Sequence, residues 1–156
     1  MLTIRPAVPD DLAHIMAIVE RAVDEMNHRG NPQWGPGYPS LAHYAGALAE
    51  GSLYVAEDGA LLGCAVFNTE EEPAYASVSW SFPGPALVIH KMVVDPDAQR
   101  RGVARAARAR PDNHRNLRNQ ARGRRVALED VGVTAQRGHA LFNARAAAVV
   151  DEHKRA

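Results

Sequence analysis

Residues 92–104 read MVVDPDAQRRGVA, and they predict an apolar strand, an Asp-Pro stop and the start of a helix. A helix start presents unpaired backbone N–H groups and the positive end of the helix dipole, which suits a phosphate. Gly102 lets the backbone approach a ligand closely, Ala104 stays small, and Arg100 and Arg101 add cationic donors. We interpret the stretch either as a phosphate-binding loop or as an ordinary strand–turn–helix corner with solvated arginines.

The segment QRRGVA, Gln99–Ala104, resembles motif A of the GNAT acyltransferase superfamily, which reads Q/R-x-x-G-x-G/A after a strand ending in V-x-P, here Val94-Asp95-Pro96. In that family the loop holds the pyrophosphate of acetyl-CoA, and the backbone of the preceding strand holds the pantetheine arm. The resemblance therefore implies acetyl-CoA as the acyl-donor cosubstrate. It places these residues at the cosubstrate site: Met92, Val93, Val94, Arg100, Arg101, Gly102, Val103, Ala104 and Arg105.

The same resemblance implies an α/β fold, with a mixed, mainly antiparallel central sheet that is flanked by helices and splayed at its central strand. The resemblance to the family extends from about Leu2 to Ala104 and, more weakly, to about Val150. The helix after motif A is rich in arginine and poor in leucine, and Pro111 cannot continue a helix. We predict that this helix ends at or before Pro111 and that Asp112–Gly123 is irregular.

Two further departures lie near the C-terminus. Phe142 stands where the family often has a tyrosine that protonates the departing thiolate, and it carries no hydroxyl. Ala135 or Gln136 stands where the family usually has an asparagine.

Length and composition favour a single domain over residues 1–156. The chain is 46% hydrophobic, has a formal net charge of zero and contains one cysteine, Cys64, within an apolar run. We predict a buried strand thiol there rather than a nucleophile.

No apolar run reaches the ~18–20 residues that span a bilayer, and no signal-peptide pattern opens the chain, so we expect a cytoplasmic protein without a membrane partner. The arginines between Arg105 and Arg125 form a basic block, but no aromatic residues interleave them, so nucleic-acid binding is the weakest interpretation.

Periodicity and turn residues predict the order of elements along the chain. Asp10 and Ser40 are candidate helix caps, and Asp58-Gly59 predicts a two-residue hairpin turn. The expected elements are a strand over 2–5, a helix from 11 with an apolar face, a loop over 31–39, a helix over 41–50, strands over 53–57, 60–69 and 86–94, a strand over 125–131 and a helix over 134–145.

His90 interrupts the apolar strand 86–94. Strict strand alternation places His90 on the same face as Met92 and Val94. A neutral imidazole suits the deprotonation of an attacking amine, and some members of the resembled family carry a histidine at this strand position. The alternative is a core histidine that bonds a backbone carbonyl.

The loop over 31–39 combines Trp34 and Tyr38 with rigid turn residues. In the resembled family this connection borders the acceptor pocket, so both rings are candidates for substrate binding. The alternative is that they only attach the loop to the core. Trp80 and Phe82 are candidates for the opposite wall.

The resemblance, together with these residues, implies an N-acetyltransferase that acylates an amine of a small molecule or protein, and we expect no metal site. A backbone N–H near Val94 is a candidate for stabilising the tetrahedral oxyanion. The alternative is a GNAT-fold module that binds acyl-CoA as a sensor without turnover, which Phe142 favours. The acceptor stays open, and so does the choice between monomer and homodimer.

Overall fold

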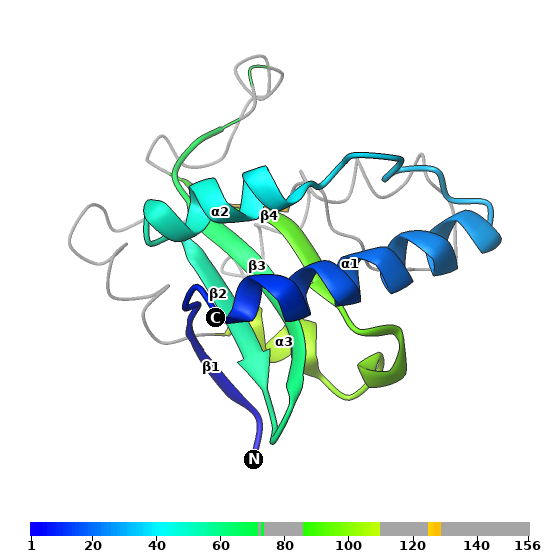
Figure 1. The fold of residues 1–156 in the computed structure, drawn as a ribbon. Coiled ribbons are helices and arrows are strands. Elements are labelled where there is room, and N and C mark those ends of the chain that lie inside the picture. Colours follow the sequence, from blue (N-terminus) through cyan, green and yellow to red (C-terminus); the bar gives the residue numbers. More distant parts are fainter. Residues whose placement is uncertain (72, 74–85, 110–124, 129–156) are drawn as a thin grey trace, which may run out of the picture.

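The computed structural model describes residues 1–71, 73, 86–109 and 125–128, and its elements follow the predicted order (Figure 1). They are β1 (Thr3–Pro6), α1 (Asp11–His28), α2 (Leu41–Ala49), β2 (Leu53–Glu57), β3 (Leu61–Asn68), β4 (Ala86–Val94), the 3-10 helix η2 (Pro96–Ala98), α3 (Val103–Arg108) and β5 (Arg125–Leu128). The expected helix over 134–145 lies outside the described residues, and a single domain over the whole chain stays a prediction.

The strands form one sheet in the order β1-β2-β3-β4-β5. The first four pair antiparallel, and β5 pairs parallel to β4, which confirms the mixed, mainly antiparallel sheet. The pairing of β5 covers Ala86–Ile89 of β4, and the described part of β5 gives no partner to His90–Val94 along that edge. Within the part of the chain that is described, β4 and β5 therefore stop pairing halfway along β4.

Helices cover both faces of the sheet. The helices α1 and α2 lie together on one face, and α3 lies on the other (Figure 1). The apolar face predicted for α1 is confirmed, since Ile15, Val19 and Met26 are buried against the sheet. No helix within the described ranges has both the length and the apolar character needed to cross a membrane.

A charged cluster holds β1 against the start of α1. Two nitrogens of the Arg5 guanidinium donate to the two carboxylate oxygens of Asp11, at 2.7 and 2.9 Å, and a third donates to Glu57 at 2.9 Å. Asp11 also accepts the Val8 N–H at 2.8 Å. Asp10, the predicted cap, makes no side-chain capping bond: its backbone is already helical rather than extended, and the Leu12 N–H bonds to the Pro9 carbonyl at 3.2 Å. The Arg5 guanidinium, followed by the Val8 N–H, holds the pKa of Asp11 below its ordinary value.

We expect Asp11→Asn to lower the free energy of unfolding by about 1–3 kcal/mol near pH 7, because it weakens charge-assisted hydrogen bonds in a buried position. Since the folded-state pKa lies below the unfolded value of ~3.9, the stabilisation is present above that value and is lost as pH falls through the folded pKa. The difference between wild type and variant should therefore shrink in urea unfolding curves taken from pH 7 down to pH 3.

The matched control is Asp10→Asn, which changes an exposed aspartate without a side-chain cap bond. It should change the unfolding free energy by less than about 0.5 kcal/mol. An equal loss in both variants, or a difference that stays constant down to pH 3, would contradict this account.

Candidate functional site

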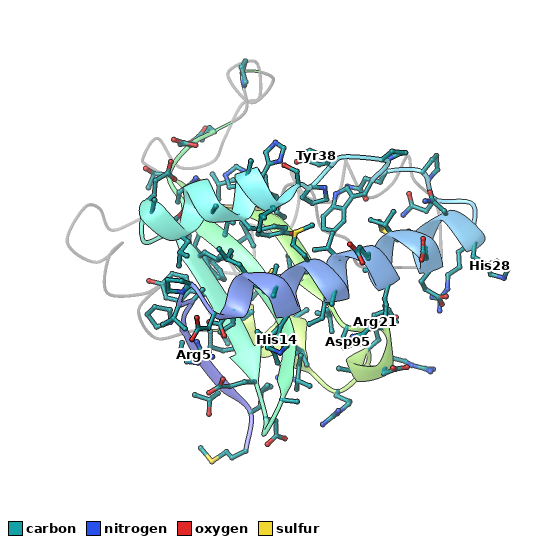
Figure 2. The ribbon with its side chains drawn as sticks, viewed as in Figure 1. Arg5, His14, Arg21, His28, Tyr38 and Asp95 are labelled. Carbon is teal, nitrogen blue, oxygen red and sulfur yellow. The ribbon has the colours of Figure 1, made fainter. Side chains whose placement is uncertain are left out.

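Asp95 fixes the chain where it leaves β4. Its backbone N–H donates to the Leu62 carbonyl at 2.8 Å, and its side chain accepts the Asp97 N–H at 3.1 Å. The same carboxylate forms an ion pair with Arg21 in the middle of α1, and Figure 2 shows the two side chains meeting. The root of the following loop is thus tied both to β3 and to α1.

Two residues of the loop that follows Asp95 have a left-handed backbone conformation. Arg100 has φ +63° and Gly102 has φ +82°, and α3 begins at Val103. A residue with a Cβ is strained at such angles, which explains the glycine at position 102. A Cβ built at Gly102 would meet no described atom within 4 Å, so the space beside the backbone is open to a ligand.

The start of α3 presents donors to this space. The N–H of Ala106 bonds to the Gly102 carbonyl at 2.9 Å, so helix geometry leaves the N–H groups of the residues in between, Val103, Ala104 and Arg105, without intrahelical acceptors. The side chains of Arg100, Arg101 and Arg105 are exposed around the loop. One guanidinium nitrogen of Arg101 lies 4.0 Å from Asp58, and the other two arginines have no acidic partner among the ion pairs of the described residues. Open space, backbone donors and cationic side chains are the features that bind a pyrophosphate.

The end of β4 and the start of α3 form one packed unit. They share a small apolar pocket between α3 and the sheet, which five of the predicted cosubstrate residues line: Met92, Val93, Val94, Val103 and Ala104. The side chains of Met92, Val93, Val94 and Val103 are buried. These four residues can therefore offer a ligand their backbone groups, while the exposed arginines offer side chains.

A β-bulge changes the face on which His90 lies. Cys64 pairs with Val93, but the next pair along is Val66 with His90, so Ala65 stands opposite two residues of β4. One of those two is Lys91, whose φ is +47°. The bulge reverses the alternation of side chains between His90 and Met92.

The prediction that His90 shares a face with Met92 and Val94 is therefore wrong. Met92 and Val94 pack on the side of the sheet that α3 covers. His90 is a cross-strand partner of Val66, which packs with α1 and α2 on the other side. His90 is 8% exposed there, and its Nε2 lies 2.8 Å from the Oδ1 of Asn68, a side-chain partner rather than the backbone carbonyl considered from the sequence.

Tyr44 of α2 supports this bulge from the same face. Its side chain is fully buried, and its hydroxyl donates to the Lys91 carbonyl at 3.3 Å. Cys64 is also buried, and burial raises the pKa of its thiol to about 12, which confirms the predicted strand thiol and makes it a poor nucleophile.

The two aromatic residues of the α1–α2 connection have different surroundings. Trp34 is 0% exposed and packs inside the core, and its Nε1–H has no hydrogen-bond acceptor among the described atoms. Tyr38, labelled in Figure 2, is half-buried. Its ring makes edge-to-face contacts with Trp34 and His43, with ring centroids 6.5 and 5.2 Å apart. The burial of Trp34 fits the alternative of attachment to the core, whereas Tyr38 keeps part of its surface exposed.

Sequence reasoning missed three residues near the site. Asn68 holds His90, Tyr44 holds the bulge, and Gly63 lets β3 approach β4, since a Cβ there would lie 2.4 Å from the Val93 carbonyl oxygen. Each of these contacts joins residues at least 22 positions apart. Only the isolated Gly63 within a strand pattern offered a sequence signal, for a close backbone approach.

The C-terminal expectations are tested only in part. The helix after motif A ends at Arg108, as predicted. The strand predicted over 125–131 is present as β5 over Arg125–Leu128. The other predicted features lie outside the described residues: Trp80, Phe82, the irregular segment 112–123, Ala135, Gln136 and Phe142.

Comparisons with solved structures give the same fold. An acetyltransferase of the GNAT family from Streptococcus agalactiae 2603 is 27% identical with a TM-score of 0.60, and the match covers 66% of this chain and 64% of that one. A candidate acetyltransferase from Staphylococcus aureus Mu50 is 25% identical with a TM-score of 0.59, over 75% of this chain and 74% of that one. A predicted acetyltransferase from Clostridium acetobutylicum, solved with acetyl-CoA, shares the fold at 18% identity and a TM-score of 0.53, over 93% and 88% of the two chains.

Comparison of the sequence identifies a family but no individual curated relative. A search of curated proteins finds no match to the chain. The model of the acetyltransferase (GNAT) family matches residues 19–110, which include the second half of α1, the bulged strand β4 and the loop around Gly102. Because that match covers more than half of the chain, the protein belongs to the acetyltransferase (GNAT) family.

Proposed function

We propose that this protein transfers an acetyl group from acetyl-CoA to an amine of a small molecule or protein. The observation that carries the proposal is the loop around Gly102, where open space, unpaired helix N–H groups and three exposed arginines meet. A pyrophosphate supplies the two negative charges and the acceptor oxygens that such a loop stabilises. The acetyl-CoA found with the Clostridium acetobutylicum neighbour supports this choice of ligand.

Several residues would hold acetyl-CoA. Arg100, Arg101 and Arg105, with the backbone N–H groups around Gly102, would bind the pyrophosphate. The backbone of Met92–Val94 would bind the pantetheine arm, since the described part of β5 does not pair with that edge of β4. A backbone N–H near Val94 would stabilise the oxyanion that forms when the amine attacks the thioester carbonyl.

His90 would act as the general base. Its imidazole lies on the α1/α2 face, at the start of the bulge and ahead of the proposed pantetheine strand. It would take a proton from the substrate ammonium, and the resulting neutral amine would attack the thioester carbon. The C–N bond would form, the nitrogen would give its second proton to water, the C–S bond would break, and the thiolate of CoA would leave and take a proton from water.

The acceptor would enter from the α1/α2 face. Tyr38 keeps an exposed part on the connection between the two helices that cover this face, and its ring can pack against an apolar or cationic group. Trp34 would position Tyr38 from the core through their edge-to-face contact and would not touch the acceptor itself.

A second candidate function is acyl-CoA binding without turnover. It is favoured by Phe142, which lacks the hydroxyl that often protonates the leaving thiolate in this family. Such a module would use the loop around Gly102 in the same way but would release no CoA.

The decisive experiment incubates the purified protein with acetyl-CoA and a panel of amines, including polyamines, amino acids, aminoglycosides and lysine peptides. Release of free CoA thiol and a mass increase of the acceptor would support the transferase. Saturable binding of acetyl-CoA without thiol release from any amine would favour the binding module. Absence of binding would contradict both candidates.

A further inference from the structure

Asn68, the last residue of β3, connects His90 to the segment that follows β3. Its Oδ1 lies 2.8 Å from His90 Nε2 and accepts the backbone N–H of Glu70 at 3.1 Å. Its Nδ2 donates to a carboxylate oxygen of Glu70 at 3.3 Å. A single amide thus contacts an imidazole, a backbone N–H and a carboxylate.

The strand register brings these two side chains together. Asn68 pairs with Val88, and His90 pairs with Val66, so the two are diagonal neighbours on the same face of the antiparallel pair. The bulge begins directly after His90, at Lys91. His90 is therefore placed on this face by the β3–β4 ladder and not by the irregular part of β4.

The contacts to Glu70 decide which way the amide points. The backbone N–H of Glu70 can only donate and its ionised carboxylate can only accept, so these two hydrogen bonds are made with the oxygen of Asn68 toward the backbone and its nitrogen toward the carboxylate. The same oxygen faces His90 Nε2. Because a carbonyl oxygen only accepts, Nε2 must carry a hydrogen, and the lone pair of the neutral imidazole then lies on Nδ1.

We propose that Asn68 is a positioning residue that holds His90 in the Nε2–H tautomer and makes Nδ1 the nitrogen that accepts the proton of the amine. The catalytic half of this inference rests on the proposed acetyl transfer, whereas the tautomer does not. The proton moves from the ammonium nitrogen to Nδ1, which gives a neutral amine and an imidazolium. Asn68 accepts a hydrogen bond from Nε2 before and after that transfer.

The first test observes the tautomer directly. Long-range ¹H–¹⁵N correlation spectra of the labelled chain at alkaline pH, where the imidazole is neutral, distinguish Nε2–H from Nδ1–H in each of the 7 histidines. The His90→Gln variant assigns the His90 signals. We expect only Nε2–H in the wild type, Nε2–H again in Asn68→Asp, whose oxygen also accepts, and a mixture of tautomers in Asn68→Leu.

The control is Asn31→Leu. Asn31 Oδ1 accepts the N–H of the residue two positions on, Gln33, as Asn68 accepts that of Glu70, but it has no contact with His90 among the hydrogen bonds of the described residues. The His90 tautomer should be the same in this variant as in the wild type. Finding Nδ1–H in the wild type, or an unchanged pure Nε2–H in a folded Asn68→Leu, would overturn the proposal.

The second test uses the acceptor found in the amine panel. We expect Asn68→Leu to lower kcat about tenfold or more and to leave the KM for acetyl-CoA within about twofold, with most of kcat retained in Asn68→Asp. Equal activity of Asn68→Leu and wild type would overturn the catalytic half of the inference. If the wild type shows the Nε2–H tautomer but turns over no amine, the proposed transferase fails while the assigned hydrogen bond stands.

Discussion

Gly102→Glu should abolish the thermal stabilisation that acetyl-CoA gives to the wild-type protein. A ligand at about 100 times its dissociation constant stabilises the folded state by ~2.7 kcal/mol, which raises the melting temperature of a domain of this size by several degrees. The glutamate would place a side chain and a negative charge where the structure has open space beside the helix N–H groups. Both effects oppose a pyrophosphate, so differential scanning fluorimetry with and without acetyl-CoA should show no shift.

Two controls separate the lost site from backbone strain. Gly51 has φ +70° and open space around it, so Gly51→Glu suffers similar strain and gains the same charge far along the chain from the loop. It should lower the melting temperature of the free protein but keep the full shift. Gly102→Ala, which adds strain without charge, should keep a reduced shift. If Gly102→Glu keeps the full shift in melting temperature, acetyl-CoA binds elsewhere on the protein.

The second large effect is expected at His90. If His90 takes the proton of the amine, His90→Gln should lower kcat by about 10²–10⁴-fold and flatten the acidic limb of the pH–rate profile, because no imidazole is left to become protonated there. Glutamine keeps a polar side chain within reach of Asn68 and leaves a smaller cavity than alanine. The affinity for acetyl-CoA should change little, because backbone groups and arginines would bind it, whereas the substitution alters only a side chain on the α1/α2 face.

The control for His90 is His28→Gln, at the exposed end of α1 (Figure 2). Its turnover and pH profile should match those of the wild type. A folded His90→Gln protein with an unchanged pH profile would assign His90 to packing and would leave proton removal to solvent or to another group.

The elements of the first hundred residues were predictable because local chemistry determines them. Apolar spacing predicts the buried face of α1, and a nearly continuous apolar run predicts a strand covered on both sides. Asp58-Gly59 predicts the hairpin between β2 and β3, although the structure places three residues rather than two between the paired Glu57 and Leu61. The end of α3 before Pro111 was predictable for the same reason, since a proline restricts its own neighbourhood whatever the rest of the chain does.

The surroundings of individual side chains were less predictable. The sequence around Trp34 predicts an exposed ring on a stiff loop, but the side chain is fully buried in the core between α1 and the sheet. Burial depends on how much space neighbouring elements leave, and no property of the segment 31–39 encodes that. Asp10 poses the same difficulty: its place before the helix predicts a cap, but it makes no capping bond, and Arg5 on β1 contacts the neighbouring Asp11 instead.

The sequence by itself determined the order of the elements, the loop after β4 and the residues that surround Gly102, because each of these depends on residues that are close neighbours along the chain. Only the tertiary structure decided the face on which His90 lies and its partner. A bulge arises when two strands match unequal numbers of residues, and here it needs Ala65 opposite Lys91 and Met92, with Tyr44 bonded to the Lys91 carbonyl. Alternation along β4 alone therefore predicts the wrong face, and the pairing of β3 with β4 corrects it.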